Sequence, residues 1–251
     1  MESVRWNHAE RHPITPYVRS LALFLQADDS YAPFDAADRL DGADSRPLTC
    51  LTVVVQHGMG LSSPLTQRLA QSPHLAGIRS LTLETGIFDQ PLDVMLEALA
   101  ELTELRCPDV QQSDNHFQNL IQHPKAAQLE TLHLEGVQDI LVTLAETTHL
   151  TGLRTLEVPH SGGHNSVESA FWRRLANASF VGQLERLDVS HCLLQDHALA
   201  AFIEAAPLAA LRFLNLRHNP LTEASLGLLR DGPLPKDCEV LWDGPPLERC
   251  G

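Results

Sequence analysis

One short pattern of leucines recurs along most of this chain and constrains its fold more than any other feature. Apolar residues stand at its first, fourth and sixth positions, and the best copies are Leu129-Leu132-Leu134, Leu153-Leu156-Val158, Leu184-Leu187-Val189 and Leu211-Leu214-Leu216. Weaker copies are Leu48-Leu51-Val53, Ile78-Leu81-Leu83, Leu105-Pro108-Val110 and Cys238-Leu241-Asp243. Successive copies start 24 to 31 residues apart. A period of this length indicates a solenoid of stacked repeats.

The clearest copy begins at Leu211, reaches Asn219 and continues into an apolar pattern that ends at Leu229. It resembles the leucine-rich-repeat family, and the resemblance covers about residues 45–245. Asn219 and, one repeat earlier, Cys192 stand at the family's Asn/Cys position, where the side chain is expected to bond backbone left unpaired after the strand. Other copies carry Gln56, Gly86, Ser113, Val137 and Ser161 there. The resemblance therefore implies an incomplete ladder.

Apolar residues at helical spacing lie between the leucine phrases. The sets are Leu92, Met95, Leu96 and Leu99; Val167, Phe171 and Leu175; and Leu199, Phe202 and Ile203. One strand and one helix per repeat resemble the ribonuclease-inhibitor-like subtype of the family. This resemblance implies an α/β fold, a right-handed solenoid of about eight repeats with a parallel inner sheet and outer helices.

The two ends of the chain depart from the repeat. Residues 1–45 hold no copy of the phrase, and Val18, Leu21, Phe24 and Leu25 after Thr15-Pro16 predict an amphipathic helix. Because solenoid ends expose their core, we expect residues 1–45 to form an N-terminal helical cap. Residues 46–251 would then form the solenoid with a short C-terminal cap. In its last copy Asp243 replaces an inward leucine, as suits an edge strand.

Outward positions of the strands predict the binding face. Between inward leucines the side chains point outward, and stacked strands turn them into columns. Acidic residues gather there as Glu84, Asp109, Glu135, Glu157 and Asp188. Such close like charges are unfavourable unless something compensates them. Two interpretations stay open: a docking strip for a basic protein, or the ordinary solvated surface of an acidic chain.

The position after the first leucine alternates in charge. From Arg106 onward it reads Arg106, Glu130, Arg154, Glu185, Arg212 and Glu239. Opposite charges on neighbouring strands stabilise a sheet by roughly 0.2–1 kcal/mol a pair. The pattern predicts a structural salt ladder along one rim, which makes these arginines poor candidates for catalysis.

Three histidines recur at one position of consecutive repeats, His160, His191 and His218. Imidazoles one strand apart could share a metal ion beside Glu157 or Asp188. No HExxH spacing accompanies them, and histidine before asparagine is a common filler in the resembled family. An exposed polar ladder is therefore favoured, and we expect no metal and no other cofactor.

Composition excludes several classes of function. The chain has 251 residues with a formal net charge of −14, which disfavours nucleic-acid binding because phosphate contacts need Lys and Arg. Its apolar runs are too short for a membrane span, and residues 21–25 are too short for a signal sequence. Five cysteines without a CxxC pair suit a reducing compartment, so a cytoplasmic location is expected.

The sequence predicts a non-catalytic, cytosolic interaction module or scaffold, because no catalytic motif such as GxSxG or a phosphate loop is present. A protein partner, favoured to be basic, would bind the concave face. The candidate contacts are Glu84, Asp109, His133, Glu135, Glu157, His160, Asp188, His191, Asn215, Arg217 and His218. The alternatives are a regulator of a small GTPase resembling Ran-type GTPase-activating proteins, with Arg217 as its arginine, and a host-directed effector.

Overall fold

The computed structural model describes residues 4–6, 20–25, 49–55, 60–61, 76–84, 87–88, 97, 99–108, 115–136, 140–161 and 169–247. The chain divides into two compact units, residues 1–129 (unit 1) and residues 130–251 (unit 2). Both are α/β and both contain parallel strands. Each is described by itself.

Unit 1 holds a parallel sheet in the order β1-β2-β3-β5-β7. Its strands are β1 (Val4–Trp6), β2 (Ser20–Leu25), β3 (Cys50–Val55), β5 (Ser80–Glu84) and β7 (Glu104–Cys107). The short strands β4 (Gly60–Leu61) and β6 (Ile87–Phe88) pair separately. Helix α4 (Asn115–Gln122) and a 3-10 turn (Pro124–Gln128) follow β7.

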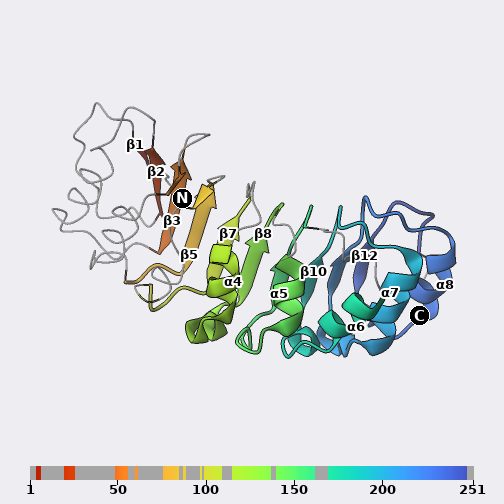
Figure 1. Ribbon diagram of the computed structural model, residues 1–251. Helices are drawn as coiled ribbons and strands as arrows, with labels where there is room; N and C mark the ends of the chain where they lie inside the picture. The colour runs from red at the N-terminus through yellow and green to blue at the C-terminus, as the bar shows by residue number, and fades with distance from the viewer. Residues whose placement is uncertain are drawn as a thin grey trace. The chain divides into compact units, whose positions relative to one another are not determined.

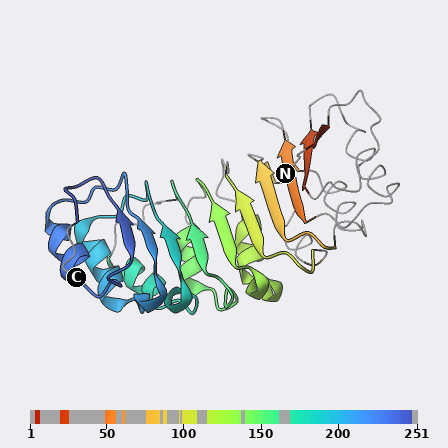
Figure 2. The same cartoon turned by 180° about the vertical axis from the view of Figure 1, so that it is seen from behind.

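Unit 2 repeats a strand and a helix in regular alternation. Its strands are β8 (Thr131–Leu134), β9 (Thr155–Glu157), β10 (Arg186–Asp188), β11 (Phe213–Asn215) and β12 (Glu239–Leu241), parallel and adjacent in chain order. Its helices are α5 (Ile140–Glu146), α6 (Ser169–Ala176), α7 (Asp196–Ala205) and α8 (Ala224–Asp231). The helices of this unit lie in front of its strands in Figure 1, and Figure 2 shows the strands from behind.

The leucine pattern forms the core of each unit as predicted. Leu81 in unit 1 is 1% exposed, and in unit 2 the fourth-position leucines Leu132, Leu156, Leu187 and Leu214 are at most 1% exposed. Leu187 pairs with Leu156 on one side and with Leu214 on the other. Alternation along a strand puts these side chains on the helix side of the sheet. Of the predicted helical sets, Leu99, Phe171, Leu175, Leu199, Phe202 and Ile203 are buried. The remaining members, Leu92, Met95, Leu96 and Val167, lie outside the described residues.

The helix predicted for the N-terminal segment was wrong over residues 20–25. These residues form β2, in which Leu21 pairs with Leu51 and Leu23 with Val53. Leu21, Leu23 and Leu25 alternate with period two, and the neighbouring strand selects this period over the helical spacing. Strands therefore occur before residue 46, while the capping role of residues 1–45 stays a prediction.

The predicted register of β7 was also wrong, by three residues. Leu105 pairs with Leu81, so it takes the fourth position of its repeat and Leu102 the first. Leu102, Leu105 and Cys107 are all buried. The predicted alignment placed Pro108 in the sheet, where a residue without an N–H cannot complete the ladder. Arg106 therefore leaves the rim for the outward position between Leu105 and Cys107, and Asp109 lies outside the described residues.

A third correction concerns β12, where the register slips by one residue. Val240 pairs with Leu214 and Leu241 with Asn215. Val240 takes the inward row instead of Leu241, because a shift of one residue exchanges the faces of a strand. Asp243 follows the strand and is exposed, so it does not replace an inward leucine.

Across the segments that can be described, no helix has the length and apolarity needed to span a membrane.

Candidate interaction surface

The face of the unit 2 sheet that points away from the helices is here called the open face. It is built from the residues that flank each fourth-position leucine, namely Thr131, His133, Thr155, Glu157, Arg186, Asp188, Phe213 and Asn215. All of them are partly exposed, in contrast to the buried leucines between them. This face carries four of the predicted contact residues, namely His133, Glu157, Asp188 and Asn215.

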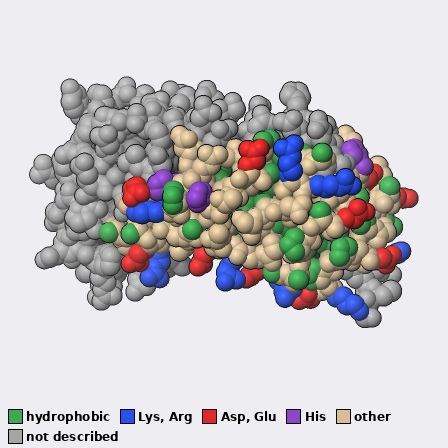
Figure 3. Space-filling view, turned by 60° about the horizontal axis from the view of Figure 1, so that its bottom comes forward, with side chains coloured by type: hydrophobic (Ala, Val, Ile, Leu, Met, Phe, Trp, Pro, Cys, Tyr) green, Lys and Arg blue, Asp and Glu red, His purple; other side chains and the backbone are tan. Residues whose placement is uncertain are grey.

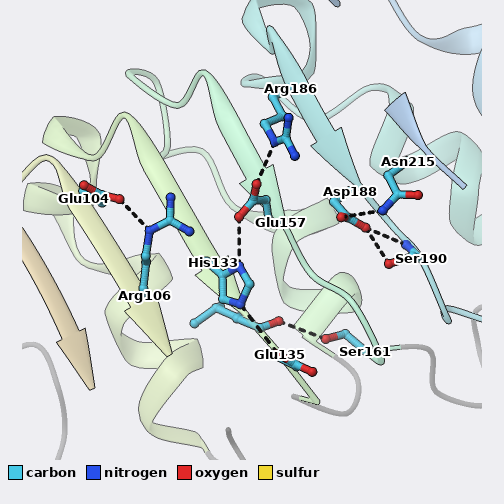
Figure 4. Close-up of polar contacts among 11 residues, drawn as sticks. Glu104, Arg106, His133, Glu135, Glu157, Ser161, Arg186, Asp188, Ser190 and Asn215 are labelled. Carbon is cyan, nitrogen blue, oxygen red and sulfur yellow. Dashed lines mark hydrogen bonds and ion pairs between the residues drawn. The ribbon is translucent and has the colours of Figure 1, made fainter. Parts of the chain in front are cut away.

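Glu157 lies at the centre of a charged network on the open face (Figure 4). Its Oε1 accepts from Arg186 Nε at 2.7 Å, and its Oε2 accepts from His133 Nδ1 at 2.9 Å. The other ring nitrogen of His133, Nε2, is buried and has no hydrogen-bond partner among the described residues. The carboxylate of Glu135 lies 3.8 Å from it. Arg186 also stacks on the ring of Phe213, with 3.6 Å from Cζ to the ring centroid.

The carboxylate of Asp188 also accepts hydrogen bonds from neighbouring groups. Its Oδ1 accepts from the backbone N–H of Ser190 at 2.9 Å and from the Ser190 hydroxyl at 2.7 Å. Its Oδ2 accepts from Asn215 Nδ2 at 2.8 Å. Figure 4 shows this group beside the Glu157 network. Two of the predicted acidic contacts, Glu157 and Asp188, are therefore held by side chains and backbone of the protein itself.

These pairings supply the compensation that a row of carboxylates requires. In unit 1, the outward residues Glu104 and Arg106 pair with each other, with Oε1 to Nε at 2.5 Å. Glu84 is exposed at the end of β5. Glu135, which follows β8 in unit 2, is more accessible than Glu157, with 38% of its side chain exposed against 13%.

The residues that follow the strands of unit 2 form a second group, here called the carboxyl edge: Glu135, His160, His191, Arg217 and His218. His160, His191 and His218 have positive φ angles of 57°, 55° and 59°. Histidine is one of the few residues besides glycine that is enriched in this left-handed region. The recurrence of histidine at this position thus has a backbone explanation as well as a side-chain one.

The three imidazole rings of the carboxyl edge stack on one another. Ring centroids lie 3.9 Å apart for His160 and His191, and 4.1 Å apart for His191 and His218. Partial burial, together with the neighbouring His160 and His218, lowers the pKa of His191, against the opposing influence of Asp243 and Asp188. Rings stacked face to face direct their lone pairs side by side instead of toward one point. Within the described segments no group of three or more His, Cys, Asp or Glu side chains could hold a metal ion.

A ladder of side chains supports the turn behind these histidines. Ser161 Oγ donates to Leu134 O at 3.2 Å, Cys192 Sγ to Val158 O at 3.1 Å, and Asn219 Nδ2 to Val189 O at 2.9 Å. Each bond reaches the sixth-position carbonyl of the preceding repeat. The ladder was expected to be interrupted at Ser161. It continues there, because the Ser161 hydroxyl reaches the equivalent carbonyl, Leu134 O.

The rim salt ladder forms in part. Arg154 and Glu185 pair at 2.6 Å, Nη1 to Oε1, as predicted. Arg212 pairs with Asp237 because the slip of β12 moves Glu239 out of the rim position. On the face drawn in Figure 3, acidic and basic side chains are interspersed. The rim is thus a structural feature of mixed charge.

Sequence reasoning missed three residues of this surface. Arg186 stands just before an inward leucine, at an outward position that had not been considered. Ser190 donates to Asp188 from both its backbone N–H and its hydroxyl, and the backbone bond has no signature in a side-chain pattern. Leu193 is the large hydrophobic side chain that is exposed among the described residues, at 51%, and its φ is 58°. An exposed leucine in a left-handed conformation has no signature in the repeat.

Comparison with known proteins gives limited information. No protein-family model matches the chain, and no curated protein matches it either. Among solved structures, it is similar to a chain in the crystal structure of the Rad7 and Elc1 complex in yeast, at 14% identity and a TM-score of 0.41 over 82% of this chain. It is also similar to a protein from Bacteroides fragilis, at 13% identity and a TM-score of 0.42 over 91%. The chain spans 65% and 66% of their lengths. The function therefore has to be inferred from the residues of this chain.

Proposed function

We propose that the chain is a non-catalytic module that binds a protein partner through the carboxyl edge of unit 2. The observation that carries this proposal is a contrast in exposure. The charges at the centre of the open face are bonded to each other, whereas His160, Arg217 and His218 at the carboxyl edge are exposed. Groups that still face solvent are the ones that can bond to a partner without first breaking internal contacts.

A binding role is favoured over catalysis because the side chains that could transfer protons are bonded to neighbours or buried. Glu157 is bound to Arg186 and His133, and Nε2 of His133 is buried. A general base must reach the proton that it removes, within about 3 Å or through one water. The arrangement suits recognition, in which pre-ordered side chains lower the entropy lost on binding.

The same proposal includes the finer features implied by the sequence. The chain is taken to be a right-handed leucine-rich-repeat solenoid of about eight repeats that acts in the cytoplasm. The net charge of −14 favours a basic protein partner over nucleic acid. Glu135 is the carboxylate of the carboxyl edge that such a partner would meet.

The experiment compares two variants of equal net charge. Glu135→Lys with Arg217→Glu reverses both charges at the carboxyl edge. Arg174→Glu with Glu204→Lys makes the same exchange at exposed positions of α6 and α7. The wild-type chain is used to capture partners from an extract of the native host. Each captured partner is identified and purified, and its affinity is measured for the wild type, the carboxyl-edge variant and the helix variant.

We expect a direct partner to lose at least tenfold in affinity for the carboxyl-edge variant and to bind the helix variant like the wild type. Its affinity for the wild type should fall as salt rises. Equal affinity for the edge variant, or a loss confined to the helix variant, would contradict the proposed location.

Regulation of a small GTPase is a second candidate that rests on Arg217. This side chain is exposed, lies outside the rim and makes no ion pair with any residue that the structure describes. Purified small GTPases would be assayed for single-turnover GTP hydrolysis with the wild type and with Arg217→Ala. A supplied arginine accelerates hydrolysis by roughly 10³–10⁵. Acceleration that survives Arg217→Ala would remove this candidate.

A further inference from the structure

The stack of imidazoles at the carboxyl edge ends in a glycine on each side. From the pairing of His133 with Glu157, Gly136 lies level with His160 in the neighbouring repeat. From the pairing of Asn215 with Leu241, Gly244 lies level with His218. Gly136 has the same left-handed backbone as the histidines, with φ 74°. A ring placed at Gly136 would therefore extend the stack by one member.

At the His218 end of the stack, the position that a side chain on Gly244 would take is already filled by the protein. The indole of Trp242 lies against Gly244, and its ring atoms would overlap with a Cβ placed there. The indole N–H donates to Pro245 O at 3.0 Å, which fixes the ring in this place. Asp243 accepts from the backbone N–H of His218. Its carboxylate also lies 3.9 Å from Nδ1 of the His218 ring.

The end of the stack at His160 has the same carboxylate but a different neighbour. Glu135 Oε1 lies 4.0 Å from Nε2 of His160. At the other end, Asp243 Oδ2 lies 3.9 Å from Nδ1 of His218. Half of the His160 side chain is exposed, and 38% of the Glu135 side chain. At this end the residue level with the outermost ring is Gly136, which has no side chain to cover that ring. Among the described residues, this end of the stack therefore presents a half-exposed imidazole beside a partly exposed carboxylate.

We propose that this end of the stack is a binding site for the guanidinium group of an arginine supplied by the partner, stacked on His160 and paired with Glu135. The inference rests on the proposed function and names the chemistry of one contact in it. A guanidinium is planar, stacks on aromatic faces and donates to carboxylates in the same plane. The spacing of 3.9 and 4.1 Å between the existing rings is the spacing at which such a group stacks.

The open face already contains one arginine held in this way. Arg186 lies 3.6 Å from the ring of Phe213 and donates to Glu157 at 2.7 Å. The site at His160 and Glu135 offers the same two elements, a ring and a carboxylate, to a guanidinium from outside. The pKa of the middle ring, His191, is lowered by burial and by the neighbouring His160 and His218, so this ring takes up a proton less readily than a free histidine.

Lysine and citrulline separate the two elements of recognition. An ammonium pairs with Glu135 but cannot stack, and citrulline is planar but has no charge. The probes are N-acetyl-arginine amide, N-acetyl-lysine amide and N-acetyl-citrulline amide. Binding is followed by NMR, from the ring C–H signals of His160, assigned by their loss in His160→Ala. We expect arginine to bind in the millimolar range and both analogues at least fivefold more weakly.

Variants locate the probe at one end of the stack. Gly136→His should fill the position with a fourth ring and weaken arginine binding at least fivefold, and Glu135→Gln should do the same without touching the backbone. Gly136→Ala introduces the same backbone strain without a ring. Its affinity for the arginine probe should stay within twofold of the wild type. His218→Ala removes the ring at the opposite end of the stack and should also bind arginine within twofold of the wild type.

Equal binding of arginine and lysine, or undiminished binding by both Gly136→His and Glu135→Gln, would overturn the inference. Failure of the arginine probe would leave the proposed function standing if the carboxyl-edge variant still lost the partner. Conversely, the arginine probe could bind as expected while the partner binds the carboxyl-edge variant like the wild type. That result would contradict the proposed function and leave the arginine site standing.

Discussion

The side-chain oxygen of Asn219 accepts the backbone N–H of Leu194 at 2.9 Å and thereby joins two consecutive repeats of unit 2. The same oxygen accepts the N–H of Cys192 at 3.0 Å. These two donors flank Leu193, so one amide group holds both sides of the residue with φ 58°. Asn219 Nδ2 donates to Val189 O and Leu216 O, both at 2.9 Å. The turn beneath the carboxyl edge thus depends on one side chain.

Asn219→Ala should lower the free energy of unfolding by about 2 kcal/mol or more, because several backbone groups lose their partner and each unsatisfied group costs about 1–3 kcal/mol. Urea unfolding measures the change through the midpoint at constant m value. Asn177→Ala is the control, since Asn177 is exposed and the bond described for its side chain is a single one, from Nδ2 to Arg173 O. Equal losses in the two variants would show that the clamp is not specific.

Leu193→Asn should raise stability by about 1 kcal/mol. A non-glycine residue in the left-handed region costs roughly 1–2 kcal/mol, and asparagine adopts this region more readily than leucine. Little packing is lost because the Leu193 side chain is 51% exposed. The thermal midpoint of unfolding gives the sign of the change. Leu194→Asn, at a side chain 1% exposed, should destabilise strongly, and a destabilised Leu193→Asn would mean that contacts of Leu193 outweigh its strain.

The stability of the chain should fall as the pH is lowered through the ordinary histidine value of 6.5. The pKa of His191 is lowered in the folded state, first by burial and then by His160 and His218. The unfolded chain therefore binds more protons in this window, and proton uptake drives unfolding. Denaturant midpoints measured between pH 5 and pH 8 should decline less in His191→Asn than in the wild type. His197→Asn, outside the stack, should keep the wild-type slope; identical slopes for both variants would exclude the stack as the cause.

Leu187→Ala should destabilise the fold by about 2–5 kcal/mol, the usual range for truncating a buried leucine. Leu187 is 1% exposed and lies between Leu156 and Leu214 in the sheet. Glu185→Ala is the matched control in the same repeat, because it removes one exposed ion pair with Arg154, worth about 0–1 kcal/mol. Chemical denaturation separates the two cases. A change below 1 kcal/mol for Leu187→Ala would contradict its place in the core.

Local sequence patterns predicted the parts of the fold in which each repeat allows only one alignment of its apolar residues. In β8 to β11 each phrase offers one leucine or valine for each inward position, so a single alignment buries them all. Where a second alignment was possible the prediction failed. Leu102 and Leu105 are three residues apart and both suit the first position, and the pairing of Leu105 with Leu81 decides between them. Val240 and Leu241 present the same ambiguity in β12.

The candidate site was predicted less well than the fold. The sequence indicates that Glu157 and Asp188 point outward, and they do. It does not indicate that Arg186 and His133 bond to Glu157, or that Asn215 bonds to Asp188, because these partners come from repeats 24 to 31 residues away. The histidine column was visible as a repeat, but the stacking of its rings depends on their shared left-handed backbone.

The sequence alone determined that unit 2 stacks repeats of a strand and a helix, since the burial of leucine needs no information beyond its spacing. It also determined which residues can point outward in the regular repeats. The tertiary structure alone decided the register of β7 and β12, the strand at residues 20–25 and the pairing of the outward charges. Register and pairing are relations between strands. Their free energies depend on which neighbour lies opposite, and a neighbour's position is fixed only when the strands pack together.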